Sequence, residues 1–331
     1  MAVDRLRQMA NLQTPMVLRV AATLRLADLI ADGVTTGGGL AERTGTDRDA
    51  LARLLRHMAF LGLLAPDGEG YRLTELGEAL RSTHPAGVAR SLDANEPVGR
   101  IDLAHVRLLD TVRTGRAAYP LVHGRGFWED LAADPELAAR FDRHMSSGDV
   151  APGVAAYDWS AVGHVVDVGG GSGRLLAGIL HAAPYARGTL VELPGAAEAG
   201  RRRFADAGLS GRADVVARTF FDPLPAGADV YVLANVLHDW GDAEAEAILR
   251  RCAEAAGTRG RVLVFSGVLD GAEDAAPGTG FDLFMLVCFG GRERTLGEFE
   301  VLGARAGLTL AAASPVDASF GHLMEFDAAS R

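Results

Sequence analysis

The sequence contains no lysine, so all 33 of its basic residues are arginine. This absence excludes Schiff-base catalysis, and with it pyridoxal-phosphate enzymes and lysine-dependent aldolases. It also excludes the phosphate-binding lysine of P-loop proteins and the ATP-binding lysine of protein kinases. Only two cysteines occur, Cys252 and Cys288. Two are too few for a disulfide framework, an iron–sulfur cluster or a cysteine zinc site.

Long apolar runs are also missing. No uncharged apolar stretch approaches the roughly 18 residues that a membrane helix needs, and the first fifteen residues lack the apolar segment of a secretory signal. We therefore expect a cytoplasmic protein without membrane contact. The net charge is −10, from 33 basic and 43 acidic residues. An acidic chain argues against nucleic acid as its main partner.

The composition is that of a globular protein, with 48% hydrophobic and 23% charged residues. A length of 331 residues suits two domains better than one. The character of the sequence changes near YDWSAVG at 157–163. We therefore predict a helical domain over 1–156 and a second domain over 157–331.

The N-terminal part has the periodicity of helices. Apolar residues at helical spacing predict one helix over 16–32, stopped by Gly33. A helix-turn-helix follows over 40–64, with Thr46 or Asp47 as the cap of its second helix. Two short strands then flank an Asp-Gly-Glu-Gly turn at 67–70. Together these elements predict a winged-helix pattern, followed by more helices over 88–150.

From residue 164 onward, short apolar runs alternate with helical patterns. Such alternation predicts an α/β fold, a doubly wound parallel sheet covered on both faces. The helices are expected near 173–182, 195–207 and 242–256. The strands are expected at 164–169, 188–193, 213–217, 228–236 and 261–269, with two further candidates at 308–313 and 322–326.

A glycine-rich segment, Asp167-Val-Gly169-Gly-Gly171-Ser-Gly173, stands where the first strand of this sheet meets its first helix. Glycines at that place let a ligand approach the backbone and the helix N-terminus. Glu192 ends the next strand, where its carboxylate could accept both hydroxyl hydrogens of a ribose. The nicotinamide pattern G-x-G-x-x-G fails here, because its last glycine would fall on an arginine. The alternative is a tight turn beside a solvent-facing glutamate.

A histidine motif, LANVLHDWGD, follows the fourth strand at 233–242. The carboxyl ends of strands in a doubly wound sheet line the ligand crevice, so His238 is placed to face it. With an ordinary pKa near 6.5, a histidine can take a proton from a phenol near neutral pH. Asp239 or Asp242 could cap the following helix. The remaining histidines form no metal-spaced pair, and we expect no metal.

The D-x-G-x-G-x-G turn with its acid on the second strand resembles that of class I S-adenosylmethionine-dependent methyltransferases. The motif Leu-His-Asp-Trp at 237–240, with GGRERT at 290–295, resembles plant-type and bacterial small-molecule O-methyltransferases, among them enzymes that tailor anthracyclines and other aromatic polyketides. The resemblance extends to LQTPMVLRVAATLRLADLI at 12–30 and FWEDLAADPELAARFDRHM at 127–145. It implies a Rossmann-like catalytic domain, a winged-helix dimerisation domain and a homodimer.

The resemblance also implies roles for single residues. His238 would be the general base and Glu293 the carboxylate that orients it. S-adenosylmethionine would be held by Asp167, the three glycines of the turn and Glu192. An aromatic or polyketide-type acceptor would be bound by Trp128, Met145, Asp239 and Met285. Each role has a purely structural alternative. His238 could be a histidine at a helix start, and Glu293 could pair with Arg292 or Arg294 at the surface. The apolar pocket residues could belong to ordinary core packing.

The sequence departs from this family in three places. The family's Gly-Asp-x-Phe after the third strand is replaced by Arg-Thr219-Phe220-Phe, where Thr219 could bond the adenine and Phe220 pack on it. Ala234 replaces a lysine or serine, and Ser266 a second carboxylate. Because relatives with this fold also catalyse hydroxylation, decarboxylation or cyclisation, these remain alternatives to O-methyl transfer. A DNA-binding regulator built on the winged helix is a third.

Overall fold

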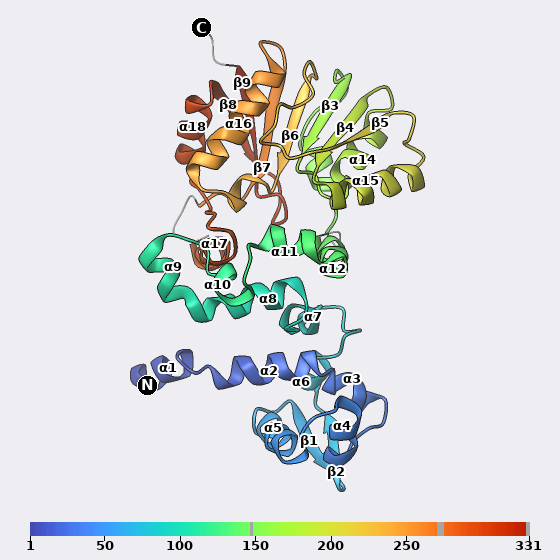
Figure 1. Ribbon diagram of the computed structural model, residues 1–331, viewed down its shortest axis with the longest axis vertical. Helices are drawn as coiled ribbons and strands as arrows, with labels where there is room; N and C mark the ends of the chain where they lie inside the picture. The colour runs from blue at the N-terminus through green and yellow to red at the C-terminus, as the bar shows by residue number, and fades with distance from the viewer. Residues whose placement is uncertain (146–147, 270–274, 329–331) are drawn as a thin grey trace. The chain divides into compact units, whose positions relative to one another are not determined.

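The computed structural model describes residues 1–145, 148–269 and 275–328. The chain forms two compact units, Met1–Leu103 and Ala104–Arg331 (Figure 1). The boundary predicted after residue 156 lies inside the second unit, shortly before its first strand, His164–Val168. The helices between 104 and 156 therefore belong to the same compact body as the sheet. Among the described residues, no helix is long and apolar enough to cross a membrane.

The first unit is mostly helical, with one small hairpin. Strands β1 (Leu64–Asp67) and β2 (Gly70–Leu73) pair antiparallel around the predicted turn. Its core is made by leucines such as Leu26, Leu40 and Leu55, which are fully buried. The helices are α1 (Ala2–Met9), α2 (Gln13–Thr23), α3 (Leu26–Ala31), α4 (Gly37–Thr44), α5 (Arg48–Phe60), α6 (Glu75–Glu78), α7 (Val88–Leu92) and α8 (Pro97–Ala104).

One predicted feature of the first unit, the cap of α5, is present, and another, a single helix over 16–32, is not. Asp47 caps α5 as predicted, because its side chain accepts a hydrogen bond from the backbone N–H of Ala50 at 2.9 Å. The single helix predicted over 16–32 is wrong, since it is divided into α2 and α3. The break lies at Arg25, whose φ of +53° is incompatible with a continuous helix. The apolar periodicity continues through the break and therefore hides it.

The second unit is built on a seven-stranded sheet in the order β5-β4-β3-β6-β7-β9-β8. The first five strands along the chain are parallel, and the last two add an antiparallel edge. All the strands predicted from the sequence are present. Their bounds are β3 (His164–Val168), β4 (Arg187–Glu192), β5 (Ala213–Ala217), β6 (Val230–Ala234), β7 (Arg261–Ser266), β8 (Leu308–Pro315) and β9 (His322–Ala328).

Helices of the second unit cover both faces of this sheet (Figure 1). The three helices predicted between strands are present, whereas α17 and α18 were not predicted. Residues 281–289 are apolar on nearly every side, so they show no helical period. The helices are η1 (His105–Arg107), α9 (Leu108–Thr114), α10 (Tyr119–His123), α11 (Phe127–Ala133), α12 (Pro135–Met145), α13 (Ala151–Ala155), α14 (Arg174–Ala182), α15 (Pro194–Asp206), η2 (Leu237–Asp239), α16 (Asp242–Ala256), α17 (Ala275–Phe289) and α18 (Leu296–Arg305).

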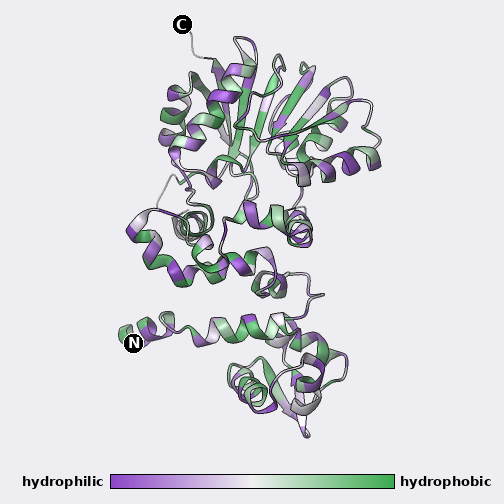
Figure 2. Cartoon of the chain, viewed as in Figure 1, coloured by the Kyte–Doolittle hydropathy of each residue, from purple (hydrophilic) through white to green (hydrophobic). Residues whose placement is uncertain are grey.

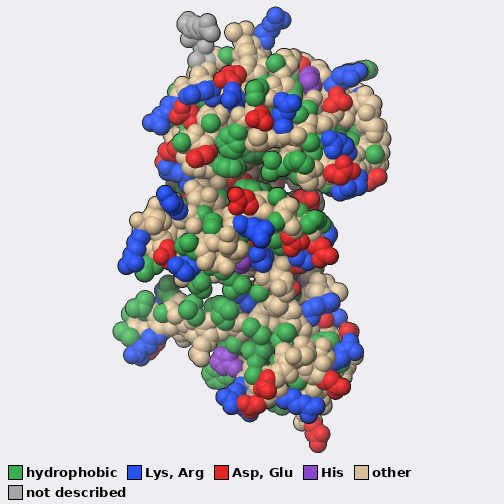
Figure 3. All heavy atoms as spheres, in the orientation of Figure 1, with side chains coloured by type: hydrophobic (Ala, Val, Ile, Leu, Met, Phe, Trp, Pro, Cys, Tyr) green, Lys and Arg blue, Asp and Glu red, His purple; other side chains and the backbone are tan. Residues whose placement is uncertain are grey.

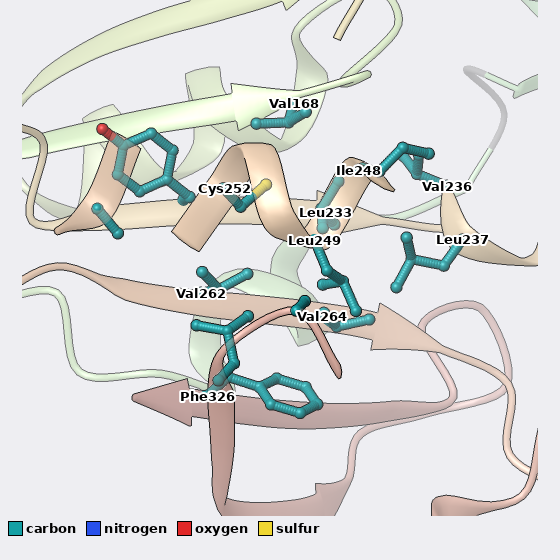
Figure 4. Close-up of a cluster of buried hydrophobic side chains, with 14 of the residues drawn as sticks. Val168, Leu233, Val236, Leu237, Ile248, Leu249, Cys252, Val262, Val264 and Phe326 are labelled. Carbon is teal, nitrogen blue, oxygen red and sulfur yellow. The ribbon is translucent and has the colours of Figure 1, made fainter. Parts of the chain in front are cut away.

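Strands β3, β4, β6 and β7 are mostly apolar and buried, and they fill the interior of the second unit (Figure 2). On one face, Val262 and Val264 of β7 pack with Ile248 and Leu249 of α16 and with Phe326 of β9 (Figure 4). Full burial of each such side chain contributes about 1.5–3 kcal/mol. This core fixes the sheet rigidly. The parallel strands therefore deliver the residues that follow their carboxyl ends to one common edge.

Candidate active site

The glycine turn connects β3 to α14 through three residues with left-handed backbone. The φ angles of Gly169, Gly171 and Gly173 are +73°, +58° and +72°, which only glycine adopts without strain. Two of these positions also lack room for a side chain. A Cβ atom at Gly173 would lie 2.6 Å from the ring of Phe204, and one at Gly169 would lie 3.0 Å from Val236. The turn is therefore a cradle of bare backbone at the start of a helix.

Two acidic side chains lie beneath this cradle. Asp167 is fully buried, and Glu192 accepts a hydrogen bond from the backbone N–H of Gly171 at 3.2 Å. Burial, reinforced by the charge of Glu192, raises the pKa of Asp167 to about 7. Burial likewise raises the pKa of Glu192 to about 7. The Glu192 carboxylate is therefore in contact with the turn, against the alternative of a solvent-facing glutamate.

Phe220 and Thr219 follow β5 at the same edge. The ring of Phe220 lies beside the cradle, since a Cβ atom on Gly169 would approach it to 3.2 Å. Thr219 is half-buried, and its hydroxyl accepts a hydrogen bond from the backbone N–H of Phe221 at 3.3 Å. The structure thus brings Phe220 to the predicted cofactor site. The Thr219 hydroxyl still has its own hydrogen to donate.

His238 lies in the short helix η2, directly after β6, and is 8% exposed. Its Nδ1 is 2.9 Å from Oε1 of Glu293, which is 4% exposed. Burial by itself would lower the pKa of His238, but the hydrogen bond to Glu293 and the charges of Asp239 and Glu293 raise it above its usual value. The alternative of Glu293 as a surface partner for an arginine is thereby excluded. The pair leaves Nε2 of the imidazole facing away from the glutamate.

Segment 292–294 holds the backbone of η2 in place. The backbone N–H of Arg292 donates to the carbonyl of His238 at 2.9 Å. The guanidinium of Arg294, 1% exposed, donates to the carbonyls of Leu237 and Trp240, both at 2.8 Å. Three backbone carbonyls, those of Leu237, His238 and Trp240, are thus held by hydrogen bonds from this segment. We name this arrangement the arginine clamp, meaning Arg294 and the backbone of Arg292.

The arginine clamp also binds Asp242, which was one of two predicted caps of α16. The sequence offered Asp239 or Asp242 as the cap of α16, but the N-cap is Gly241, without a side-chain hydrogen bond. The Asp242 carboxylate instead accepts from the Arg294 guanidinium at 2.9 Å. Because a fully buried arginine draws the nearby carboxylate to itself, the helix begins without an Asp cap. Arg294 was missed as a functional candidate, although an arginine directly after the glutamate was a usable signal.

Asp239 faces the other nitrogen of the histidine. Its Oδ1 lies 3.7 Å from Nε2 of His238. Burial raises the pKa of Asp239 to about 7, although the nearby His238 lowers it. A carboxyl group at this place can accept a proton or a hydrogen bond from a group bound against Nε2. Asp239 therefore borders the space in front of the base.

Aromatic side chains from α11 and α17 gather in the second unit. The rings of Trp128 and Phe289 are stacked, with centroids 5.3 Å apart, and the ring of Phe281 meets that of His238 edge-on at 5.7 Å. Met285 is 4% exposed, whereas Met145 is 55% exposed. Helix α17 thus contacts Trp128 through Phe289 and the base through Phe281. The backbone carbonyl of Met145 accepts a hydrogen bond from the side chain of Arg174.

Asp282 of α17 is a further residue that the sequence analysis missed. Its Oδ1 accepts a hydrogen bond from the backbone N–H of Glu293 at 2.8 Å. The one charged residue within the apolar run 281–289 was the available signal. In the described part of the chain, no group of three or more His, Cys, Asp or Glu residues could hold a metal ion.

Two family models match the sequence. Residues 105–309 match the O-methyltransferase domain and residues 6–83 match the O-methyltransferase dimerisation domain. The chain belongs to the O-methyltransferase family. This membership confirms what the motifs led us to expect: the family, the class I methyltransferase fold, the O-methyltransferase activity and the S-adenosylmethionine cofactor.

Individual relatives are similar over nearly the whole chain. A 2,7-dihydroxy-5-methyl-1-naphthoate 7-O-methyltransferase from Streptomyces carzinostaticus is 55% identical over 94% of this O-methyltransferase and 94% of its own length. Aclacinomycin 10-hydroxylase RdmB from Streptomyces purpurascens is 50% identical over 92% of this chain and 84% of its own. A crystal structure of NcsB1, an O-methyltransferase from neocarzinostatin biosynthesis, in complex with S-adenosylmethionine and 2-hydroxy-5-methyl naphthoic acid, has a TM-score of 0.88, 52% identity and 98% coverage of both chains.

Proposed function

We propose that this O-methyltransferase methylates a hydroxyl group on a fused aromatic acceptor of the naphthoate or polyketide type, with His238 as general base. One observation carries the proposal: Nδ1 of a buried His238 is bonded to Glu293 at 2.9 Å. The carboxylate keeps the proton on Nδ1, so Nε2 is left with a free lone pair. A naphthoate methyltransferase at 55% identity supports the acceptor class.

The cofactor site is proposed to consist of the glycine cradle, Asp167 and Glu192. The bare backbone of Gly169, Gly171 and Gly173 fits the close approach of a nucleoside-bearing ligand, because any side chain there would be strained or would clash. Glu192 would accept the ribose hydroxyl hydrogens. Phe220 would pack against the adenine, with Thr219 as a weaker polar contact. S-adenosylmethionine, when bound, supplies an electrophilic methyl group on a sulfonium.

The protein's own part in the reaction is to orient and to move one proton. The acceptor hydroxyl loses its proton to Nε2 of His238, and the resulting imidazolium is stabilised by the Glu293 carboxylate on its other side. Trp128 and Met285, with Met145, would bind the flat ring system. Asp239 would accept a hydrogen bond from a polar group of the acceptor beside the reacting hydroxyl. The methyl ether and S-adenosylhomocysteine are then the products.

The test is a methylation assay with 2,7-dihydroxy-5-methyl-1-naphthoate and with an anthracycline phenol as acceptors. We expect a product that gains one methylene unit, and a general base contributes about 10²- to 10⁴-fold to the rate. Glu293→Gln should keep the geometry and lower kcat at least tenfold, because it removes the charge that stabilises the imidazolium. If His238→Ala methylates at the wild-type rate, the assignment of the base is wrong.

Hydroxylation is the second candidate function, favoured by the 50% identity to an aclacinomycin 10-hydroxylase. The same incubation separates the two reactions by product mass, since hydroxylation adds an oxygen atom in place of a methylene unit. Decarboxylation and cyclisation would be seen as a loss of carbon dioxide and as no mass change. The His238–Glu293 pair supports methyl transfer, because an oriented base can take the proton that the acceptor hydroxyl loses.

A homodimer is proposed through the N-terminal helices. Apolar side chains gather on the outside of α1 and α2 (Figure 3), where Leu6, Met9 and Leu12 are 66%, 75% and 70% exposed. Such a patch is typical of a protein interface, and the match to a dimerisation domain supports a second copy of the chain as the partner. The cytoplasmic location, the absence of nucleic-acid partners and a functional boundary at 156/157, with the helices before it as a substrate lid, remain parts of the proposal.

A further inference from the structure

The second oxygen of Glu293 has unmet hydrogen-bonding capacity. Oε1 is bonded to His238, but Oε2 is buried and receives no hydrogen bond from the described residues. A buried carboxylate oxygen without a donor costs free energy, more for a charged group than for a neutral one. The oxygen lies against the end of β7, because a Cβ atom on Gly267 would approach it to 2.8 Å. Only glycine at 267 leaves space at this oxygen.

Two further polar atoms that lack a hydrogen-bond partner among the described residues lie at the end of β7 and the start of β9. Oγ of Ser266, a fully buried residue, and Nδ1 of His322 have no hydrogen-bond partner within the part of the chain that is described. Ser266 is the last residue of β7, and His322 is the first residue of β9. The two residues are direct partners in the antiparallel register. Their Cβ atoms are therefore about 4.5–5.5 Å apart on one face of the sheet.

The chain that continues from the end of β7 lies beside the segment that contains Glu293, since Val268 forms a parallel bridge with Arg294. Side chains alternate along a strand, so Ser266 points to the same side as Val264. Val264 packs into the core cluster that also contains Leu237, the residue directly before His238. The backbone beyond Ser266 also runs along Glu293, since the N–H of Leu269 donates to the carbonyl of Arg294 at 3.0 Å.

We propose that Ser266 and His322 hold one buried water molecule against Oε2 of Glu293 and thereby position the glutamate that orients His238. A buried water is typically bound by about three polar groups. Three are available here: a hydroxyl that donates or accepts, an imidazole nitrogen, and a carboxylate oxygen that accepts. Hydrogen bonds to this oxygen would fix the orientation of the carboxylate opposite the imidazolium. Ser266 and His322 are positioning residues, because neither contacts the reacting atoms.

This inference rests on the proposed role of His238 and Glu293. Ser266→Ala and His322→Leu each remove one partner of the water, and we expect kcat to fall about tenfold while KM for S-adenosylmethionine stays unchanged. The double variant should lose no more than either single variant, since both act through one water. His322→Asn places an amide near the position of Nδ1 and should restore most of the activity.

A matched control lies elsewhere in the same sheet. Thr189 and His164 form a hydroxyl–imidazole contact of 2.9 Å between β4 and β3. Thr189→Ala should lower the melting temperature while leaving kcat unchanged. If Ser266→Ala and His322→Leu behave like this control, the inference is overturned. If His238→Ala also keeps wild-type activity, the proposed function fails as well, so the two failures are distinguishable.

A crystal structure provides a second readout that does not depend on the acceptor. We expect ordered density within hydrogen-bonding distance of Oε2 of Glu293, Oγ of Ser266 and Nδ1 of His322, and its loss in the Ser266→Ala variant. A site that is dry in the wild-type crystal, or a Ser266 hydroxyl that donates to a backbone carbonyl, would contradict the proposal.

Discussion

At the scale of single residues, burial and neighbouring charges raise the pKa values of three carboxyl groups and one imidazole. The pKa values of Asp167, Glu192 and Asp239 are all raised to about 7, with burial as the main cause. The pKa of His238 is also raised, because Glu293 and Asp239 outweigh the effect of burial. Such shifts concentrate at functional sites. Here they follow the edge of the sheet from the cradle to the base.

Affinity for S-adenosylmethionine should depend on the protonation of Glu192. With a pKa of about 7, the carboxyl is increasingly protonated as the pH falls below 7, and a protonated acid accepts fewer hydrogen bonds and does not attract a cationic cofactor. We expect the dissociation constant to rise up to about tenfold per pH unit below pH 7. Calorimetric titration from about pH 5 to about pH 8 measures this, and Glu192→Gln is expected to flatten it. A wild-type affinity that is constant over this range would refute the assignment of Glu192.

At the scale of elements, the base depends on how η2 is held. The short helix has a single turn, and its flanking carbonyls are bound by the arginine clamp. A lysine has no planar fork, so it cannot donate to Leu237, Trp240 and Asp242 together. Burying an arginine is costly unless its charge is paired and its donors are used. The clamp is therefore a device that fixes the orientation of His238.

Arg294→Lys should accordingly lower kcat by about ten- to a hundredfold, because small misplacements of a catalytic group are expensive. KM for S-adenosylmethionine should change little, since the cradle is formed by other strands. Steady-state kinetics and a thermal melt of the same preparation measure both effects. The control is Arg250→Lys on α16, whose guanidinium is 53% exposed and pairs with Glu246. Equal losses in the two variants would show that the clamp has no special role.

At the scale of the whole molecule, stability should respond to pH through the same buried groups. Asp167, Glu192 and Asp239 have folded-state pKa values above their unfolded values, so the folded chain binds more protons between about pH 4 and about pH 7. The stability that these groups contribute is present at low pH and is lost as the pH rises through about 7. His238, with its raised pKa, acts in the same direction.

We therefore expect the melting temperature of the ligand-free enzyme to fall between about pH 5 and about pH 8. Saturating S-adenosylmethionine should oppose this fall, because it binds the ionised form of Glu192. Differential scanning fluorimetry with and without the cofactor makes the comparison, with Asp239→Asn as a variant of smaller slope. A melting temperature that rises steadily over this range would contradict the expected proton linkage.

The exposed apolar face of α1 and α2 should govern assembly. Leu12→Arg places a charge among side chains that are proposed to be buried between two copies, and a buried unpaired charge is strongly unfavourable. Light scattering after size-exclusion chromatography should show a dimer for the wild type and a monomer for this variant. Val301→Arg is the control, since Val301 is 52% exposed on α18 and outside the match to the dimerisation domain. A wild-type monomer would refute the homodimer.

Patterns confined to a few consecutive residues were predictable from the sequence. The strand–helix alternation, the glycine turn and the motif around His238 are local, because backbone geometry and apolar periodicity are written into neighbouring residues. The break at Arg25 and the helix α17 were not predictable. In the first, the periodicity continues across the break, and in the second an apolar surface on every side gives no period at all. Cofactor, substrate and catalytic roles came from resemblance and, for individual residues, remain predictions.

The sequence by itself determined the sheet, the cradle and the identity of the family. Only the tertiary structure decided that Glu293 stands 2.9 Å from His238, although 55 residues separate them along the chain. It alone placed Arg294 and Asp282 around that pair, and Ser266 opposite His322. The physical reason is that these contacts join segments brought together by sheet register and core packing, and no local pattern of residues encodes a distance across a fold.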